Sequence, residues 1–342
     1  MSPPSYDELL EETGQIGPWQ LWIFFWIWLS QFFQAMINMA AVFIQLTPEH
    51  QCSMEPENVP GILPGDQVPN LTSSRCHVGW RSQYGNDTGR IMERACSKWS
   101  FSKEVMEETI VTQWNLVCEQ AVRVADTQSV FMAGFFVGAL LSGMFSDRFG
   151  RKKVVSISGT VVAIFGVLQT HCPSFALFLV CRFVLSVANV ACYSTGFVLC
   201  MEVTTSKYRD ILGGMFYIPY ALGYASLSIV AYFLRDWHQL HTAISLPIVL
   251  NLLYWWMLPE SPRWLLSKER KSQAAVILTK AAKWNGKKSV DVAKILMEDE
   301  TTESCASSES LEAPSTVRQS VHFLHIFKYP TLVARCCLMC FV

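Results

Sequence analysis

The residues of this chain that could do chemistry include charged side chains at the ends of long apolar runs. The densely basic stretch from Gly143 to Lys153 lies between two such runs, and further charged side chains stand where other runs end. Opposite charges at helix ends can form an ion-pair network that holds one face of a bundle closed. The candidate gate residues are Gly143, Asp147, Arg148, Gly150, Arg151, Lys152, Glu202, Arg209, Glu260 and Arg263. The alternative is that these charges are solvated and only set the topology, because an exposed ion pair contributes about 0–1 kcal/mol.

Polar and aromatic side chains inside the apolar runs form a second candidate set. Gln31, Gln34 and Asn38 are spaced at i, i+3 and i+7, so they share one face of a helix. Aromatic faces attract quaternary ammonium groups by roughly 0.5–2 kcal/mol each, although the same rings also pack between helices. The candidate residues of a substrate pathway are Gln31, Gln34, Asn38, Phe135, Phe136, Arg182, Asn189, Tyr193, Tyr217, Tyr220 and Tyr224.

Arg182 differs from the other candidates because it lies eight residues into an apolar run that starts near Ser174. An arginine inside a membrane is costly and is usually functional or paired. Either it faces the bundle interior and bonds to backbone carbonyls or a neighbouring helix, or it contacts a substrate or a gate. No acidic residue lies deep in any apolar run, so the charge preference of a substrate does not follow from the sequence.

Composition narrows the class of protein. The chain is 51% hydrophobic and 16% charged, against about 25% charged residues in an average soluble domain, which predicts a polytopic membrane protein. The sequence contains no phosphate-binding loop, paired metal-ligand spacing or nucleophile elbow. We therefore expect no enzyme activity, no cofactor and no metal. The net charge of −1 gives no field that would favour nucleic acid as a partner.

The apolar runs predict an all-α bundle of six membrane-spanning helices, since a helix needs about 20 apolar residues to cross a bilayer. The predicted spans are 19–46, 127–146, 153–171, 174–200, 211–234 and 239–258. A cytoplasmic segment 1–18 precedes them, and a polar cytoplasmic loop 259–330 follows. The twelve residues 331–342 are apolar and predict a seventh span that begins and is not completed.

The polar segment 47–126 carries the signals that orient the bundle. It contains cysteines at 52, 76, 96 and 118 and glycosylation sequons at Asn70 and Asn86. An even cysteine count beside sequons predicts disulfides on an oxidising, extracellular side, with the connectivity left open. A zinc site is the alternative, but cysteine spacings of 20 to 24 residues favour disulfides. Basic side chains gather in loops of the opposite side, which predicts that these loops and the N-terminus are cytoplasmic in a plasma-membrane protein.

Several motifs resemble those of known carriers. The pattern Gly143-x-x-x-Asp147-Arg148-x-Gly150-Arg151-Lys152 resembles the signature loop of the major facilitator superfamily. Segments similar to the organic ion transporter family of solute carriers are Thr47–Cys52, Trp114–Cys118 and Pro259–Leu266. Segments most similar to its organic cation and carnitine branch are Phe197–Leu199, Ala231–Trp237 and Lys280–Lys283.

The resemblance implies the N-terminal, six-helix half of a carrier that moves small organic ions by rocking against a second half. It also implies that the gate residues form a conformational latch and that Tyr193 lines a cavity. The implied partners are the organic ion, the lipid bilayer and the C-terminal half that this chain does not contain. The alternatives are a truncated product that associates with full-length carriers, a carrier of organic anions, and a receptor whose cysteine-rich loop binds a ligand.

Overall fold

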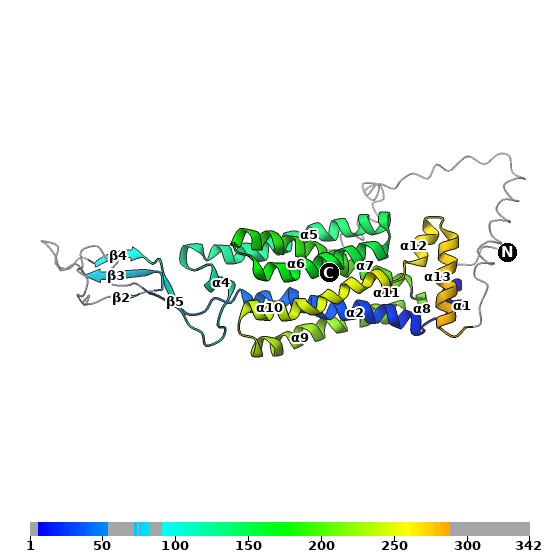
Figure 1. Cartoon of the computed structure of the whole chain (residues 1–342), viewed down its shortest axis with the longest axis horizontal. Helices are drawn as coiled ribbons and strands as arrows, with labels where there is room; N and C mark the ends of the chain where they lie inside the picture. The colour runs from blue at the N-terminus through cyan, green and yellow to red at the C-terminus, as the bar shows by residue number, and fades with distance from the viewer. Residues whose placement is uncertain (1–5, 54–71, 74, 82–90, 288–342) are drawn as a thin grey trace, which may run out of the picture. The chain divides into compact units, whose positions relative to one another are not determined.

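A computed structural model describes residues 6–53, 72–73, 75–81 and 91–287 (Figure 1). The sequons at Asn70 and Asn86 and the predicted start of a seventh span lie outside these residues. Most of the predicted loop 259–330 lies outside them as well.

Six helical segments of the described chain are long and apolar enough to cross a membrane, as the sequence predicts. They lie alongside one another in Figure 1. The first segment consists of α2 (Pro18–Met39) and α3 (Ala41–Ile44), and the second consists of η2 (Cys118–Gln120) and α5 (Val122–Phe149). The third consists of α6 (Arg151–Leu168) and η3 (Gln169–His171), and the fourth is α7 (Phe175–Glu202). The fifth consists of α8 (Ser206–Met215) and α9 (Ile218–Phe233), and the sixth consists of α10 (Trp237–Ser245), η4 (Leu246–Leu253) and α11 (Tyr254–Met257).

Close approach of helices in this bundle depends on small residues. A Cβ at Gly134 would lie 2.7 Å from the backbone oxygen of Phe183, and one at Gly138 would lie 2.6 Å from that of Val187. Both distances are too short for a real side chain, so α5 can reach the backbone of α7 only with glycine at these positions. The four-residue repeat of Gly134, Gly138 and Ser142 predicts such close packing, and the structure confirms it.

Short strands and two disulfides organise the described part of segment 47–126. Strand β1 (His50–Cys52) pairs antiparallel with β5 (Trp99–Phe101). A second antiparallel sheet has the order β2-β3-β4. Its strands are β2 (Thr72–Ser73), β3 (His77–Arg81) and β4 (Ile91–Ala95), and the short helix α4 (Ile110–Gln113) follows β5. We call the end of the bundle that carries these strands the loop end (Figure 1).

Three helices lie at the other end of the bundle, which we call the charged end (Figure 1). They are α1 (Tyr6–Thr13), α12 (Pro262–Ser267) and α13 (Lys271–Trp284). Leu9 and Leu10 of α1 are buried in one cluster with Leu278 of α13. Asn285 then fixes the N-terminal chain, because its Nδ2 donates to the backbone oxygen of Thr13 at 2.9 Å and its Oδ1 accepts from the backbone N–H of Trp19 at 3.1 Å.

Candidate functional site

Arg151 is the most connected of the predicted gate residues. Its Nε donates to Oε2 of Glu202 at 3.0 Å, and its Nη2 donates to Oε1 at 2.9 Å. The planar guanidinium therefore grips the carboxylate with two parallel bonds. Its Nη1 donates to the backbone oxygen of Ser146 and lies 2.9 Å from Oδ1 of Asp147. One side chain at the start of α6 thus joins the ends of α5 and α7.

Gly150 forms the turn between α5 and α6, and the side chain of Glu260 lies against it. Gly150 is the only residue between the two helices, and its φ of +102° belongs to the region that side chains rarely adopt. A Cβ at this position would collide with the carboxylate of Glu260. Oε1 of Glu260 accepts from the backbone N–H of Lys152 at 2.9 Å and from that of Ser261 at 3.1 Å. This carboxylate therefore binds a free N–H group at the start of α6, where the helix dipole favours negative charge.

Helix α1 supplies gate contacts that the sequence does not predict. The hydroxyl of Tyr6 donates to the backbone oxygen of Glu202 at 2.6 Å. Nη2 of Arg209 lies 3.6 Å from Oδ1 of Asp7, and it donates to the backbone oxygen of Thr204 at 3.2 Å. Within the described chain, Arg209 is therefore held by α1 and by the backbone of Thr204. These contacts join positions about 200 residues apart, so no local pattern could have revealed them.

The environment of Tyr6 determines its protonation. Burial, and then the negative charge of Glu202, raise the pKa of the Tyr6 phenol above its ordinary value of 10.0. The phenol therefore stays protonated to a higher pH than an exposed tyrosine and remains a donor to the backbone oxygen of Glu202.

The other predicted gate residues lie at the edge of this network. Gly143 is exposed, and a Cβ there would meet no atom within 4 Å. Arg148 is exposed beside the ring of Phe149, and Arg263 is exposed with its guanidinium 6.0 Å from the ring of Tyr6. These side chains contribute charge to the surface of the charged end.

Several predicted pathway residues meet around a small cavity between α2, α5, α7 and α9. Its volume is about 150 Å³. The predicted residues that line it are Gln34, Asn38, Phe135, Asn189, Tyr193 and Tyr220. Nδ2 of Asn38 donates to the Tyr220 hydroxyl at 2.7 Å, and Nδ2 of Asn189 donates to Oδ1 of Asn38 at 2.5 Å. Asn38 therefore links three helices by hydrogen bonds.

A larger neighbouring cavity of about 690 Å³ shares Asn38, Phe135 and Tyr220 with the small one. Tyr224 also lines it, with its ring centroid 4.7 Å from that of Tyr220. The two cavities are lined by amides, hydroxyls, aromatic rings and apolar side chains, and no lining residue carries a formal charge.

Four predicted pathway residues do not line these cavities. Gln31 is buried and lines neither cavity, while Phe136 and Tyr217 are 66% and 56% exposed. Arg182 is fully buried nearer the loop end, with its guanidinium 4.9 Å from the ring of Phe131. Arg182 thus faces the bundle interior and contacts the neighbouring helix α5 through Phe131, but none of its side-chain nitrogens has a hydrogen-bond partner within the described chain.

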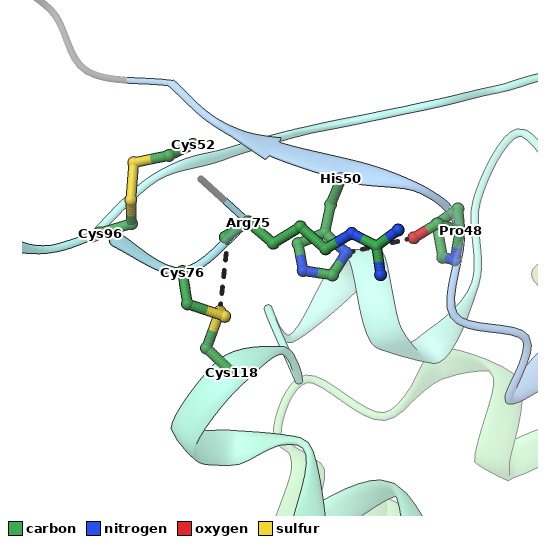
Figure 2. Close-up of a disulfide and its surroundings, with 7 residues drawn as sticks. All are labelled: Pro48, His50, Cys52, Arg75, Cys76, Cys96 and Cys118. Carbon is green, nitrogen blue, oxygen red and sulfur yellow. Dashed lines mark hydrogen bonds between the residues drawn. A yellow bond between two sulfur atoms is a disulfide. The ribbon is translucent and has the colours of Figure 1, made fainter. Parts of the chain in front are cut away.

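The four cysteines of segment 47–126 form two disulfides, which Figure 2 shows side by side. Cys52 pairs with Cys96 and Cys76 pairs with Cys118, with Cα–Cα distances of 5.9 and 5.6 Å. His50 lies near the second pair, and its Nδ1 contacts the backbone oxygen of Pro48 at 3.3 Å. The sulfurs of Cys76 and Cys118 are bonded to each other, so they cannot act as thiolate ligands to a metal here.

The chain matches known transporters in sequence. The family model described as "Sugar (and other) transporter" matches residues 70–330. The chain is 35% identical over 302 residues to organic cation/carnitine transporter 2 of Homo sapiens, covering 82% of this chain and 54% of the relative. It is 30% identical over 336 residues to the organic cation transporter protein of Drosophila melanogaster, covering 96% of this chain and 61% of the relative. The chain therefore spans between half and two thirds of the length of these curated relatives.

A solved structure shows the same fold. The proton:xylose symporter XylE of the major facilitator superfamily, bound to 6-bromo-6-deoxy-D-glucose, aligns with a TM-score of 0.50 and 15% sequence identity. The alignment covers 89% of this chain and 55% of that chain. The six membrane-length helices, the family match and the named relatives confirm the resemblance found in the sequence. The chain is a multi-pass membrane protein with the fold of a major facilitator superfamily structure. It belongs to the sugar (and other) transporter family, with organic cation and carnitine transporters among its relatives.

Proposed function

We propose that this protein moves small organic ions across the membrane by alternating access. The single observation that supports this function best is the uncharged polar cavity around Asn38, Asn189 and Tyr220. It lies between four membrane-length helices, where a substrate site of such a carrier would be expected.

The lining of the cavity favours organic cations or carnitine-like zwitterions. Tyr193, Tyr220 and Tyr224 present a row of aromatic rings, with centroids 6.2 and 4.7 Å apart. Such rings attract quaternary ammonium groups, which carnitine also contains. Two relatives carry organic cation and carnitine names, which supports the same class. No carboxylate lines either cavity, so a counter-charge for the cation would have to come from a second six-helix half.

The arrangement of the gate residues fits rocking of the described helices as one unit. The Arg151 side chain joins α5, α6 and α7, all within the same six-helix half. In this proposal the network keeps the charged end of the half rigid. Asp147, which is exposed although it pairs with Arg151, and the exposed Arg148 are accessible to the second half. Alternating access would then change contacts between halves and leave the Arg151–Glu202 pair intact.

We further propose that the loop end is extracellular and that the charged end and the N-terminus are cytoplasmic in the plasma membrane. The two disulfides and the two sequons support this orientation, as do the basic residues of the charged end. A mobility shift on glycosidase treatment should occur in the expressed chain and disappear when Asn70 and Asn86 are both changed to Gln. A chain whose mobility does not respond to glycosidase would contradict the orientation.

Uptake of radiolabelled carnitine and tetraethylammonium by cells tests the proposed transport. The chain would be expressed alone, and together with the separate C-terminal half of an organic cation/carnitine transporter. We expect uptake above mock cells when both halves are present, and a reduction of about tenfold in Tyr220→Phe, corresponding to about 1.4 kcal/mol of lost interaction. The matched control is Tyr232→Phe, because Tyr232 lies on the same helix and is 69% exposed.

Two outcomes would count against transport by this chain. If both halves reach the cell surface and uptake equals that of mock cells, the proposal fails. If the chain does not support uptake but changes transport by a co-expressed full-length relative, association with carriers would be its activity instead. Equal uptake in the Tyr220 and Tyr232 variants would show that the described cavity is not the substrate site.

A further inference from the structure

Arg182 is a buried charge without a counter-charge. Its side chain is fully buried in α7, and Nε, Nη1 and Nη2 all lack a hydrogen-bond partner in the described chain. Arg182 forms no ion pair with a carboxylate within the described chain. An isolated buried cation is strongly destabilising unless an anion or a dense set of acceptors compensates it.

Aromatic rings compensate this charge only in part. The guanidinium carbon lies 4.9 Å from the centroid of the Phe131 ring and 6.0 Å from that of Phe178. A cation–π contact stabilises a buried cation less than an ion pair with several hydrogen bonds does. The rings also accept no conventional hydrogen bond, so the five N–H groups of the guanidinium still need acceptors.

A second unpaired donor packs against the same aromatic ring, that of Phe178. Trp237 of α10 is fully buried, and its Nε1 has no partner in the described chain. Its ring lies 5.9 Å from the ring of Phe178, which is also a neighbour of Arg182. His241 follows Trp237 by one helical turn in α10 and is also fully buried. Its ring nitrogens contact Ser245 and Gln169, so it does not supply the acceptor that Arg182 lacks.

Within the described chain, the unpaired buried groups here are the three guanidinium nitrogens of Arg182, Nε1 of Trp237 and the acceptor Oε1 of Gln169, whose amide contacts His241. Donors therefore outnumber acceptors, and the positive charge has no ionic partner. Water could accept hydrogen bonds from the donors but could not neutralise the charge. A small monovalent anion does both, and a halide fits a buried site better than a bulky organic anion because Arg182 is fully enclosed. We propose that Arg182 and Trp237 form a binding site for a small inorganic anion of the chloride type, between α7 and α10 near the loop end. The site is separate from the cavity around Asn38 and does not depend on the proposed transport function.

The test is thermal unfolding of the purified full chain in detergent, titrated with chloride against gluconate at constant ionic strength. A ligand that binds only the folded state raises its stability as the free ligand exceeds its dissociation constant. We expect a saturable rise of at least about 3 °C in the unfolding midpoint at about 150 mM chloride. Bromide should act similarly, and gluconate should have no effect because it is too large to enter.

Variants connect the effect to this place in the fold. Arg182→Met should abolish the chloride-dependent shift, and Trp237→Phe should weaken the apparent chloride affinity severalfold while keeping the aromatic packing. The matched control is Arg148→Met, because Arg148 is exposed at the charged end and should leave the chloride response unchanged. A wild-type chain with no saturable halide effect would overturn the proposal even if Arg182→Met fails to fold. An unchanged chloride response in folded Arg182→Met would also overturn it.

Discussion

Removing Arg151 should destabilise the protein more than removing the charge of its ion-pair partner Glu202. Both side chains are about one-tenth exposed, and removing one partner of a buried pair is destabilising by about 3–5 kcal/mol. In Arg151→Met the Glu202 carboxylate keeps no ion-pair partner within the described chain. We therefore expect Arg151→Met to lower the free energy of unfolding by about 3–5 kcal/mol. In Glu202→Gln the guanidinium retains Asp147 and the backbone oxygen of Ser146, so we expect about 2 kcal/mol.

The assay is the free energy of unfolding of the full chain in mixed micelles, by denaturant titration followed with circular dichroism. Arg209→Met is the matched control, because Arg209 lies 3.6 Å from Asp7 and the two side chains are 32% and 43% exposed. Such an exposed pair contributes at most about 1 kcal/mol. Equal losses in the Arg151 and Arg209 variants would refute the reasoning. So would a coupling energy below about 1 kcal/mol between Arg151→Met and Glu202→Gln in a double-mutant cycle.

The structure supports three further predictions. Gly150→Ala should clearly lower the midpoint of thermal unfolding, because Gly150 has a positive φ and a Cβ there would collide with Glu260, whereas Gly143→Ala should be neutral or slightly stabilising, since its Cβ would meet open space. Equal unfolding midpoints of the two variants would contradict the role of Gly150. The free energy of unfolding should fall as pH rises above 10.0, because Tyr6 ionises at its ordinary pKa in the unfolded chain but stays protonated in the folded chain. Between pH 8 and about 11 the unfolding midpoint of Tyr6→Phe should therefore fall less steeply than that of the wild type, and identical slopes would contradict this. Cys76→Ser should release one thiol, identified by alkylation and mass spectrometry as Cys118; labelling of any other cysteine of segment 47–126 would contradict the pairing.

The sequence predicts the number of spans well because a bilayer demands long apolar runs, but it places some helix boundaries poorly. Helix α5 begins at Val122, five residues before the predicted span at 127. Arg123 and Asp126 make this first turn polar, and a helix can continue into water where polarity marks only the edge of the membrane. The sixth span includes the 3₁₀ segment η4, in which Pro247 removes a backbone donor. The polarity of the side chains thus shows which residues lie in the membrane, whereas the start of a helix and a change to 3₁₀ geometry depend on the backbone preferences of individual residues.

The sequence predicts many of the residues of the candidate site, but it does not predict which of them bond to one another. The shared face of Gln34 and Asn38 follows from helical periodicity, and both residues line the small cavity. The hydrogen bond between Asn38 and Asn189 joins positions 151 apart, and only tertiary packing brings them together. The same limit applies to Tyr6, whose partner Glu202 lies 196 positions away. A single sequence shows which residues are chemically able to interact, but the pairing depends on how the helices cross.

The cavity lies at the seam between two tightly packed helix pairs. Gly138 brings α5 against the backbone of α7, and Gly223 brings α9 equally close to a backbone carbonyl of α2. Across the seam the contacts are of another kind, because Asn38 of α2 reaches Asn189 of α7 by a hydrogen bond. Close-packed glycine contacts leave no room for a ligand, whereas a hydrogen bond can be exchanged for one with a polar ligand at a net change of only about 0.5–1.5 kcal/mol. We therefore expect a substrate to enter at the seam, where it would replace the amide partner of Asn38 and leave both helix pairs intact.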